Sequence, residues 1–182
     1  MTVVRVSTRD AILEAGFAIF SRSPDASLAD VAAHAGVGRA TLHRHFESRD
    51  VLMVALAQAA MDELNFAVDT AVSDAESHLD GLEKALYAVI PLADRQLFLA
   101  QERVEQDPKI AAAYDADRRE LVDALRGAQA EGALDASVAP EWLAAAYDSL
   151  IYAAWEMVRD GDATPKQAAA FAWRVFIKGV TA

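Results

Sequence analysis

Hydrophobic residues recur at helical spacing along most of the 182-residue chain, and no segment shows the alternation of apolar and polar residues that is typical of a strand. Start and stop signals for helices punctuate this pattern. Ser7 and Asp10 form a capping box for a first helix that ends near Phe20. We therefore expect an all-α protein.

Two short helical patterns follow within residues 27–50. Ser27 and Asp30 form a second capping box, which starts a helix through about Ala35. Gly36 then suits the left-handed conformation that ends a helix and turns the chain sharply. These signals predict two helices joined by a tight turn.

The second of these helices starts near Gly38 and turns Leu42 and Phe46 toward the interior. The side chains expected outside are Arg39, Ala40, Thr41, His43, Arg44 and His45. Arginine forks onto guanine, threonine bonds a base edge or covers a thymine methyl, and arginine or histidine holds a phosphate. The pattern is typical of a helix-turn-helix, so double-stranded DNA is the first partner to consider. The alternative is an ordinary helical hairpin with a solvated polar face.

Three stretches carry a resemblance to a known family: AILEAGFAIF at residues 11–20, SLADVAAHAGVGRATLHRHF at 27–46 and ESRDVLM at 47–53. Together they look like the DNA-binding domain of the TetR family of bacterial transcriptional repressors. The resemblance runs from Arg9 to Leu52 and continues beyond it only in the helical layout. It implies that the DNA contacts come from Ser27, Gly38, Arg39, Ala40, Thr41, His43, Arg44, His45 and Arg49.

Two of these positions depart from the family pattern. Arg49 stands where the family usually has a lysine, and His43 stands where it most often has a tyrosine that touches the DNA backbone. Histidine still donates to a phosphate. The contact from His43 then becomes pH-dependent near the ordinary histidine pKa of about 6.5.

The rest of the chain continues as helices. Pro91 interrupts one pattern and splits it into two short helices. The further helices are predicted over about residues 49–72, two segments within 82–105, 108–131, 140–160 and 165–182. We expect residues 1–50 to form a three-helix DNA-binding domain and residues 51–182 a larger helical ligand-binding and dimerisation domain, about nine helices in all.

The last two predicted helices carry more apolar surface than one neighbour within the chain need cover. Their apolar stripes consist of Trp142, Leu143, Ala146, Leu150, Ile151, Ala154, Val158, Phe171, Ala172, Val175, Phe176 and Gly179. By resemblance, these helices pack against their copies in a second subunit, which makes a homodimer. The two recognition helices then face half-sites separated by about one helical turn of 34–36 Å or a multiple of it. The alternative is that both stripes belong to the core of one chain.

The resemblance also implies a small-molecule effector bound between the helices of the larger domain. The candidate apolar lining is aromatic, with Gln101 or Asp148 as an orienting polar group. The aromatic candidates are Phe66, Tyr87, Phe98, Tyr114, Tyr152 and Trp155. A ligand that prefers a form with the DNA-binding segments swung apart lowers DNA affinity, and the helix over 49–72 transmits the motion. Aromatic residues at helical spacing are also ordinary core residues, which is the alternative.

The formal net charge of −11 seems to oppose DNA binding, because basic residues neutralise phosphates in such complexes. Residues 1–50, however, carry six Arg against six Asp or Glu, so the remaining 11 basic and 22 acidic residues lie in residues 51–182. Charges well beyond a Debye length of about 8 Å from the duplex are largely screened. The acidic excess therefore does not exclude a DNA-binding function for the neutral first 50 residues.

The chain has no cysteine, which excludes disulfides and thiolate metal sites, and we expect no cofactor. No apolar run is expected to approach the roughly 20 residues of a membrane span. The first nine residues lack the apolar core of a signal peptide. We expect a soluble, cytoplasmic protein without membrane contact.

Three classes of function remain at this point. The first is a ligand-responsive, homodimeric repressor that binds a palindromic operator and is released by a small-molecule inducer. The second is a helix-turn-helix protein-interaction module without DNA binding, which the His43 departure and the neutral first 50 residues motivate. The third is a small helical enzyme or carrier. We do not expect an enzyme, because three of the four histidines lie in the helical hairpin and His78 is expected in a loop, which leaves no catalytic set with recognisable spacing.

Overall fold

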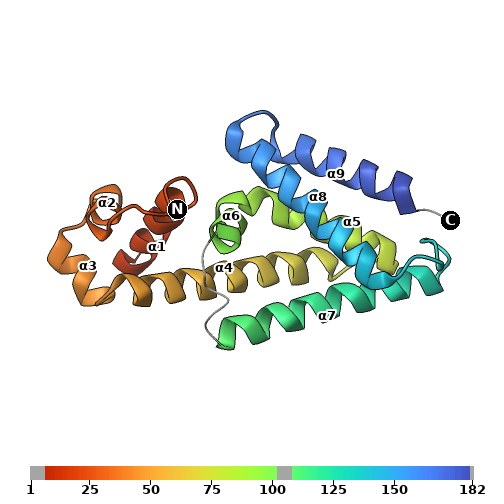
Figure 1. Ribbon diagram of the computed structural model, residues 1–182, viewed down its shortest axis with the longest axis horizontal. Helices are drawn as coiled ribbons and strands as arrows, with labels where there is room; N and C mark the ends of the chain where they lie inside the picture. The colour runs from red at the N-terminus through yellow and green to blue at the C-terminus, as the bar shows by residue number, and fades with distance from the viewer. Residues whose placement is uncertain (1–6, 102–107, 181–182) are drawn as a thin grey trace.

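The computed structural model describes residues 7–101 and 108–180. Within these residues the chain is all-α, as predicted, with nine α-helices, one short 3-10 helix and no strand. The elements are α1 (Thr8–Phe20), α2 (Leu28–His34), α3 (Arg39–His45), α4 (Arg49–Val72), α5 (His78–Val89), η1 (Ile90–Leu92), α6 (Ala93–Gln101), α7 (Pro108–Ala130), α8 (Pro140–Asp160) and α9 (Pro165–Val180). Figure 1 shows α1–α3 as a head at one end, α5–α9 as a body at the other, and α4 running from one into the other.

Capping interactions set the helix boundaries that the sequence predicted. The backbone N–H of Asp30 donates to Ser27 Oγ at 3.3 Å, and the N–H of Ser27 donates to Asp30 Oδ2 at 2.8 Å, which completes the capping box of α2. The turn after α2 places Gly36 at φ +68°, and the end of α8 places Gly161 at φ +81°. Both glycines adopt the left-handed conformation that L side chains disfavour.

The start of α5 differs from the prediction. The sequence predicted this helix only from about residue 82 and placed His78 in a loop, whereas α5 begins at His78. Ser77 is its N-cap, and its Oγ accepts the N–H of Asp80 at 3.1 Å. His78 Nδ1 also lies 2.5 Å from Glu131 Oε1, which fixes the start of α5 beside the end of α7. The Ser77–Asp80 spacing is the same capping signal that was recognised elsewhere in the chain.

Helix α4 joins head and body. Its buried face packs against α1 in the head and α5 in the body. The approach to α1 is close, because a Cβ atom at Gly16 would lie 2.9 Å from Leu56 Cδ1. The expected domain boundary after residue 50 falls within the first turn of this continuous helix, and the buried residues of head and body form one continuous hydrophobic cluster.

The composition of α4 corrects one expectation from the sequence. Over 18 consecutive residues α4 is apolar enough, and at 24 residues long enough, to pass for a membrane span. Within this window 39% of the residues are buried inside the protein. The buried residues of α4 are Leu52, Met53, Leu56, Ala57, Ala60, Met61 and Leu64. Burial within the protein is an ordinary reason for such a helix to be apolar.

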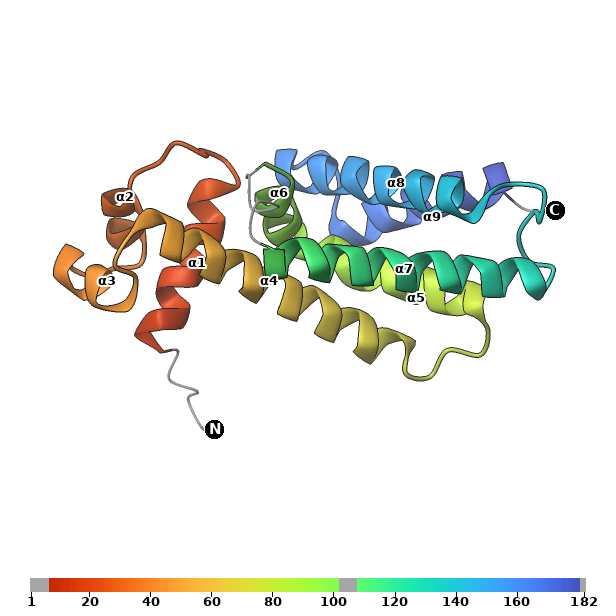
Figure 2. The same cartoon turned by 60° about the horizontal axis from the view of Figure 1, so that its bottom comes forward.

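Helix α6 lies between head and body in both views of the ribbon (Figures 1 and 2). Phe98 of α6 is fully buried and meets Phe17 edge-on, with ring centroids 5.7 Å apart, and lies 6.5 Å from the ring of Phe20. Arg95 of α6 links the three helices at the edge of this junction. Its Nε donates to Glu63 on α4 at 2.7 Å, and its Nη2 donates to Glu14 on α1 at 2.5 Å. The head is therefore fixed to the body by α6 as well as by α4.

Replacement of Phe98 by alanine is expected to lower the free energy of unfolding by about 3–5 kcal/mol, because the truncation leaves a cavity at the junction of head and body. Phe66→Ala is the matched control, since Phe66 is 73% exposed and its truncation leaves no cavity. Denaturant unfolding followed by circular dichroism measures both. Similar losses in the two variants would contradict the assignment of Phe98 to the core.

Candidate functional sites

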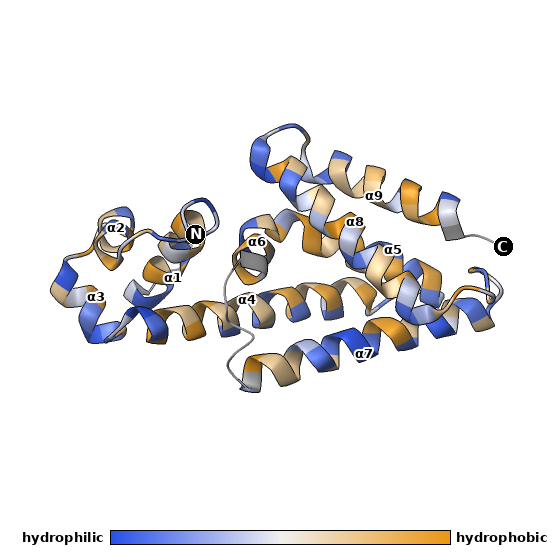
Figure 3. Cartoon of the chain, viewed as in Figure 1, coloured by the Kyte–Doolittle hydropathy of each residue, from blue (hydrophilic) through white to orange (hydrophobic). Residues whose placement is uncertain are grey.

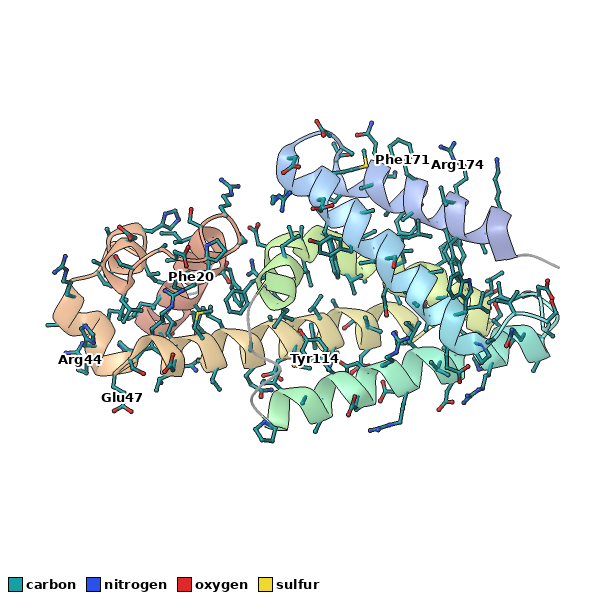
Figure 4. The ribbon with its side chains drawn as sticks, viewed as in Figure 1. Phe20, Arg44, Glu47, Tyr114, Phe171 and Arg174 are labelled. Carbon is teal, nitrogen blue, oxygen red and sulfur yellow. The ribbon has the colours of Figure 1, made fainter. Side chains whose placement is uncertain are left out.

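The first candidate site is the outer face of α3. Leu42 and Phe46 are buried and anchor α3 against the head. The remaining predicted contacts of this helix and its N-cap face outward, with Thr41 half-buried and the others exposed: Gly38, Arg39, Ala40, His43, Arg44 and His45. Figure 4 places Arg44 at the end of the molecule farthest from the body, and Figure 3 shows α3 mainly in hydrophilic colours. The structure thus brings these polar side chains together on one exposed surface.

A shallow groove of about 380 Å³ runs between the start of α2 and this face, with Ser27, Arg39 and His43 in its lining. The hydroxyl of Ser27 is engaged in the capping box, where it donates to Asp30 Oδ2 at 2.7 Å. Hydrogen bonds from Ser27, together with the charge of Arg39, lower the pKa of Asp30. The groove therefore places the guanidinium of Arg39 and the imidazole of His43 side by side in its lining, and both side chains suit contact with a phosphate.

Arg49 lies differently from the other predicted DNA contacts. Its Nη1 donates to the carbonyl oxygen of Ala26 at 2.5 Å, its Nη2 donates to the carbonyl oxygen of Pro24, and its guanidinium lies 4.5 Å from the ring centroid of Phe20. The fork of this arginine therefore holds the loop that leads into α2. Arg49 therefore positions the helix-turn-helix from within the head, a role that the sequence analysis did not predict beside the expected DNA contact.

The second candidate site is a cavity of about 690 Å³ in the body, open to solvent on one side and lined by α4, α5, α7 and α8, with Leu99 contributed by α6. Its walls are mostly apolar, with several charged side chains among them. The lining residues are Met61, Leu64, Asn65, Val68, Gly81, Leu82, Ala85, Val89, Leu99, Tyr114, Asp115, Asp117, Arg118, Glu120, Leu121, Tyr147, Asp148, Ser149, Ile151, Tyr152 and Trp155. A volume of this size accommodates a drug-sized molecule.

Four of the eight residues predicted for a ligand pocket line this cavity: Tyr114, Asp148, Tyr152 and Trp155. Tyr114 projects between α4 and α7 in Figure 4. The side chain of a fifth predicted residue, Gln101, lies outside the part of the chain that the structure describes.

The other three predicted pocket residues do not line this cavity. Phe66 faces solvent, because on α4 the cavity side belongs to its neighbours Asn65 and Leu64. Tyr87 packs half-buried against the core on another side of α5 from the lining residues. Phe98 is buried in the junction of head and body.

The aromatic walls of the cavity are fixed by hydrogen bonds to the backbone. The hydroxyl of Tyr147 donates to the carbonyl oxygen of Leu82 at 2.7 Å, and Nε1 of Trp155 donates to the carbonyl oxygen of Val89 at 3.2 Å. Burial, followed by the charge of Asp148, raises the pKa of Tyr147, so this hydroxyl stays protonated. The sequence pattern gave no sign of Tyr147, since its position on the cavity side depends on how α8 packs against α5.

The outer faces of α8 and α9 form the third candidate site. The apolar stripes predicted on these helices divide in the structure. Leu143 and Phe176 are buried between the helices, whereas Trp142, Phe171 and Val175 are 70%, 42% and 57% exposed. Figure 4 shows Phe171 and Arg174 on the outer side of α9, away from α8. These apolar side chains remain uncovered within the single chain.

Comparison with known proteins decides the family. The chain is 32% identical over 158 residues to the HTH-type transcriptional repressor LfrR of Mycolicibacterium smegmatis, which covers 86% of this chain and 82% of LfrR. The chain belongs to the TetR family. The family model of bacterial regulatory proteins, tetR family, matches residues 12–56, which include the whole helix-turn-helix. As a member of this family, the protein is a DNA-binding transcriptional regulator.

Solved structures of TetR-family regulators share the fold. The crystal structure of LfrR from Mycobacterium smegmatis in complex with proflavine superposes with a TM-score of 0.78 at 30% identity, covering 96% of this chain and 98% of that one. The ketosteroid transcriptional regulator KstR2 of Mycobacterium tuberculosis has a TM-score of 0.81 at 21% identity, covering 98% and 100% of the two chains. The similarity extends over both head and body. The predicted fold class, an all-α protein with an N-terminal helix-turn-helix, is therefore confirmed.

The variant Arg49→Lys is expected to lower the free energy of unfolding by about 1–2 kcal/mol, because lysine keeps the charge but cannot bond both loop carbonyls through a planar fork. Denaturant unfolding of the purified variant measures this loss. Unchanged stability together with weakened DNA binding would contradict the positioning role and restore Arg49 as a direct contact.

Proposed function

We propose that this TetR-family protein is a repressor that binds a palindromic operator as a homodimer and is released by a small-molecule inducer. The observation that carries the proposal is the exposed polar face of α3, anchored from below by Leu42 and Phe46. Arg39 and Arg44 supply forks for guanine or phosphate, Thr41 reads a base edge or a thymine methyl, and the remaining exposed residues follow the phosphate backbone.

The body cavity supports the inducer. Its size and mostly apolar lining are typical of sites for small molecules, and the related LfrR was crystallised in complex with proflavine. Tyr114, Asp148, Tyr152 and Trp155 are the predicted ligand contacts that line it. An inducer acts here by binding more tightly to a form whose heads are unsuited to the operator.

The outer faces of α8 and α9 support the homodimer. Trp142, Phe171 and Val175 are exposed there. A second copy of the same face covers them in a two-fold arrangement, which also gives the operator its palindromic symmetry. The protein acts in the cytoplasm, where its operator lies, and it uses neither a cofactor nor catalysis.

Selection of bound sequences from a random DNA pool tests the proposal. The purified full-length protein is expected to enrich a palindromic consensus, and the enrichment should weaken at the higher of two salt concentrations. Absence of enrichment even at low salt would contradict the proposal and favour a helix-turn-helix module that binds another protein.

On the selected operator, Arg44→Ala is expected to weaken binding broadly and to reduce the slope of log affinity against log salt by about 1 per contact. The physical reason is the loss of one phosphate contact from the exposed end of the head. Arg119→Ala removes the same charge from the exposed surface of α7 in the body and serves as the control. Equal binding by wild type and Arg44→Ala would remove Arg44 from the DNA-binding surface.

Val175→Glu is expected to convert the dimer into a monomer of 19.6 kDa, because it places a charge in the centre of the apolar face of α9. Phe66→Glu introduces the same charge at an exposed apolar position on α4 and is expected to leave the dimer intact. Sedimentation velocity measures both. A wild-type protein that sediments as a monomer, or a Val175→Glu variant that stays dimeric, would place the interface elsewhere.

A further inference from the structure

The cavity in the body carries a charge imbalance that bears on the chemical class of its ligand. Four of the acidic side chains of the described chain line it, namely Asp115, Asp117, Glu120 and Asp148, against one basic side chain, Arg118. A cavity with this balance attracts cations and repels anions. The inference drawn from it rests on the proposed function, in which this cavity holds the inducer.

The one basic group of the lining is already paired. Arg118 Nη1 lies 2.9 Å from Asp148 Oδ2, and its Nη2 donates to the carbonyl oxygen of Glu141 at 3.4 Å. These contacts tie α7 to α8 across the cavity wall. An anionic ligand would have to compete with Asp148 for Arg118 and would still face the remaining carboxylates.

Asp117, unlike Asp148, has no basic partner among the described residues. It is half-buried in the cavity wall, and its hydrogen-bond partner is the neutral amide of Asn65, whose Nδ2 lies 3.4 Å from Oδ1. Among the residues that the structure describes, no basic side chain forms an ion pair with it. Burial, reinforced by the charge of Glu120, raises the pKa of Asp117. A carboxylate held in this way is stabilised by any cation that enters the cavity.

The aromatic side chains of the lining also favour an organic cation as the ligand. The hydroxyl of Tyr147 and the indole N–H of Trp155 both donate to backbone carbonyls, so neither is available to a ligand as a donor. What these side chains offer to a ligand is ring surface. Aromatic faces attract organic cations and pack against flat apolar bodies.

We propose that the cavity selects organic cations with a flat apolar body, and that the carboxylate of Asp117 on α7 is their counter-ion. The aromatic side chains from α7 and α8 hold the body of the ligand, while Asp117 pairs with its charge. Neutral aromatic molecules of the same shape bind through the walls alone and therefore more weakly. Anions are excluded.

The test compares two dyes with the same tricyclic ring and different charge. N-methylacridinium is permanently cationic, and acridine is uncharged near neutral pH. Calorimetric titration of each into the purified 182-residue protein is expected to show tighter binding of the cation. In Asp117→Asn the affinity for the cation is expected to fall about tenfold, the equivalent of one charge-assisted contact, while the affinity for acridine stays within about twofold.

Asp123→Asn is the matched control. It removes the same charge from the same helix, but Asp123 is exposed and paired with Arg126 Nη1 at 3.1 Å, outside the cavity. This variant is expected to bind both dyes as the wild type does. Thermal unfolding of Asp117→Asn checks that the amide, which still bonds Asn65, leaves the fold intact.

Each contrary result has a distinct meaning. Equal affinity of the wild type for both dyes would overturn the selection of cations and leave the proposed repressor with a neutral inducer. Equal loss of both dyes in Asp117→Asn would overturn the counter-ion and leave Asp117 as a wall residue. Binding of neither dye to the wild type would overturn the cation proposal together with the cavity as the inducer site, while DNA selection still reports on the head separately.

Discussion

The packing of α6 against α1 is the contact on which the rest of this structure depends. Phe98 fills the space between head and body against Phe17 and Phe20, and Arg95 closes the rim with its ion pairs to α1 and α4. The next residue along α6, Leu99, lines the cavity. One short helix therefore touches the head core and the ligand cavity with adjacent side chains.

This arrangement gives a physical route between the two sites. Close-packed interiors transmit displacement because they leave no free volume to absorb it. Under the proposed function, a ligand in contact with Leu99 displaces Phe98 and Arg95, and the aromatic contact and the ion pairs carry the displacement to α1. Helix α4 provides a second route, since Met61, Leu64, Asn65 and Val68 line the cavity and the same helix packs against α1 in the head.

Charge is divided between the two ends of the molecule in a way that suits both partners. The head has no net charge over residues 1–50, and two of its arginines, Arg39 and Arg44, lie on α3. The acidic excess lies in the body, where part of it surrounds the cavity. In the proposed function, DNA and a cationic inducer meet different parts of the protein, each with a suitable local charge.

Much of the fold was predictable from local signals. The capping boxes at Ser27 and Thr164, the prolines at helix starts and the glycines at helix ends act over a few residues, so the sequence contains them in full. The exposed face of α3 was predictable for the same reason, because Leu42 and Phe46 fix its orientation. The start of α5 at Ser77 was not predicted, although its capping signal is also present in the sequence.

The cavity was predictable only in part, because its lining depends on contacts between distant segments. A step of one residue turns a side chain by about 100° around a helix, so Phe66 faces solvent while Asn65 faces the cavity. Phe98 is aromatic and apolar like Trp155, and only the packing of α6 against the head separates their roles. Arg49 likewise has the chemistry of a DNA contact and the position of a structural clamp.

The measurement that tests the account most directly is the affinity of N-methylacridinium for the free protein and for the protein saturated with its selected operator. Coupling through α6 and α4 predicts weaker dye binding on the operator, by the same factor by which the dye weakens DNA binding. Equal affinity of the dye in the two states would contradict the account, because the cavity and the DNA-binding surface would then be energetically independent.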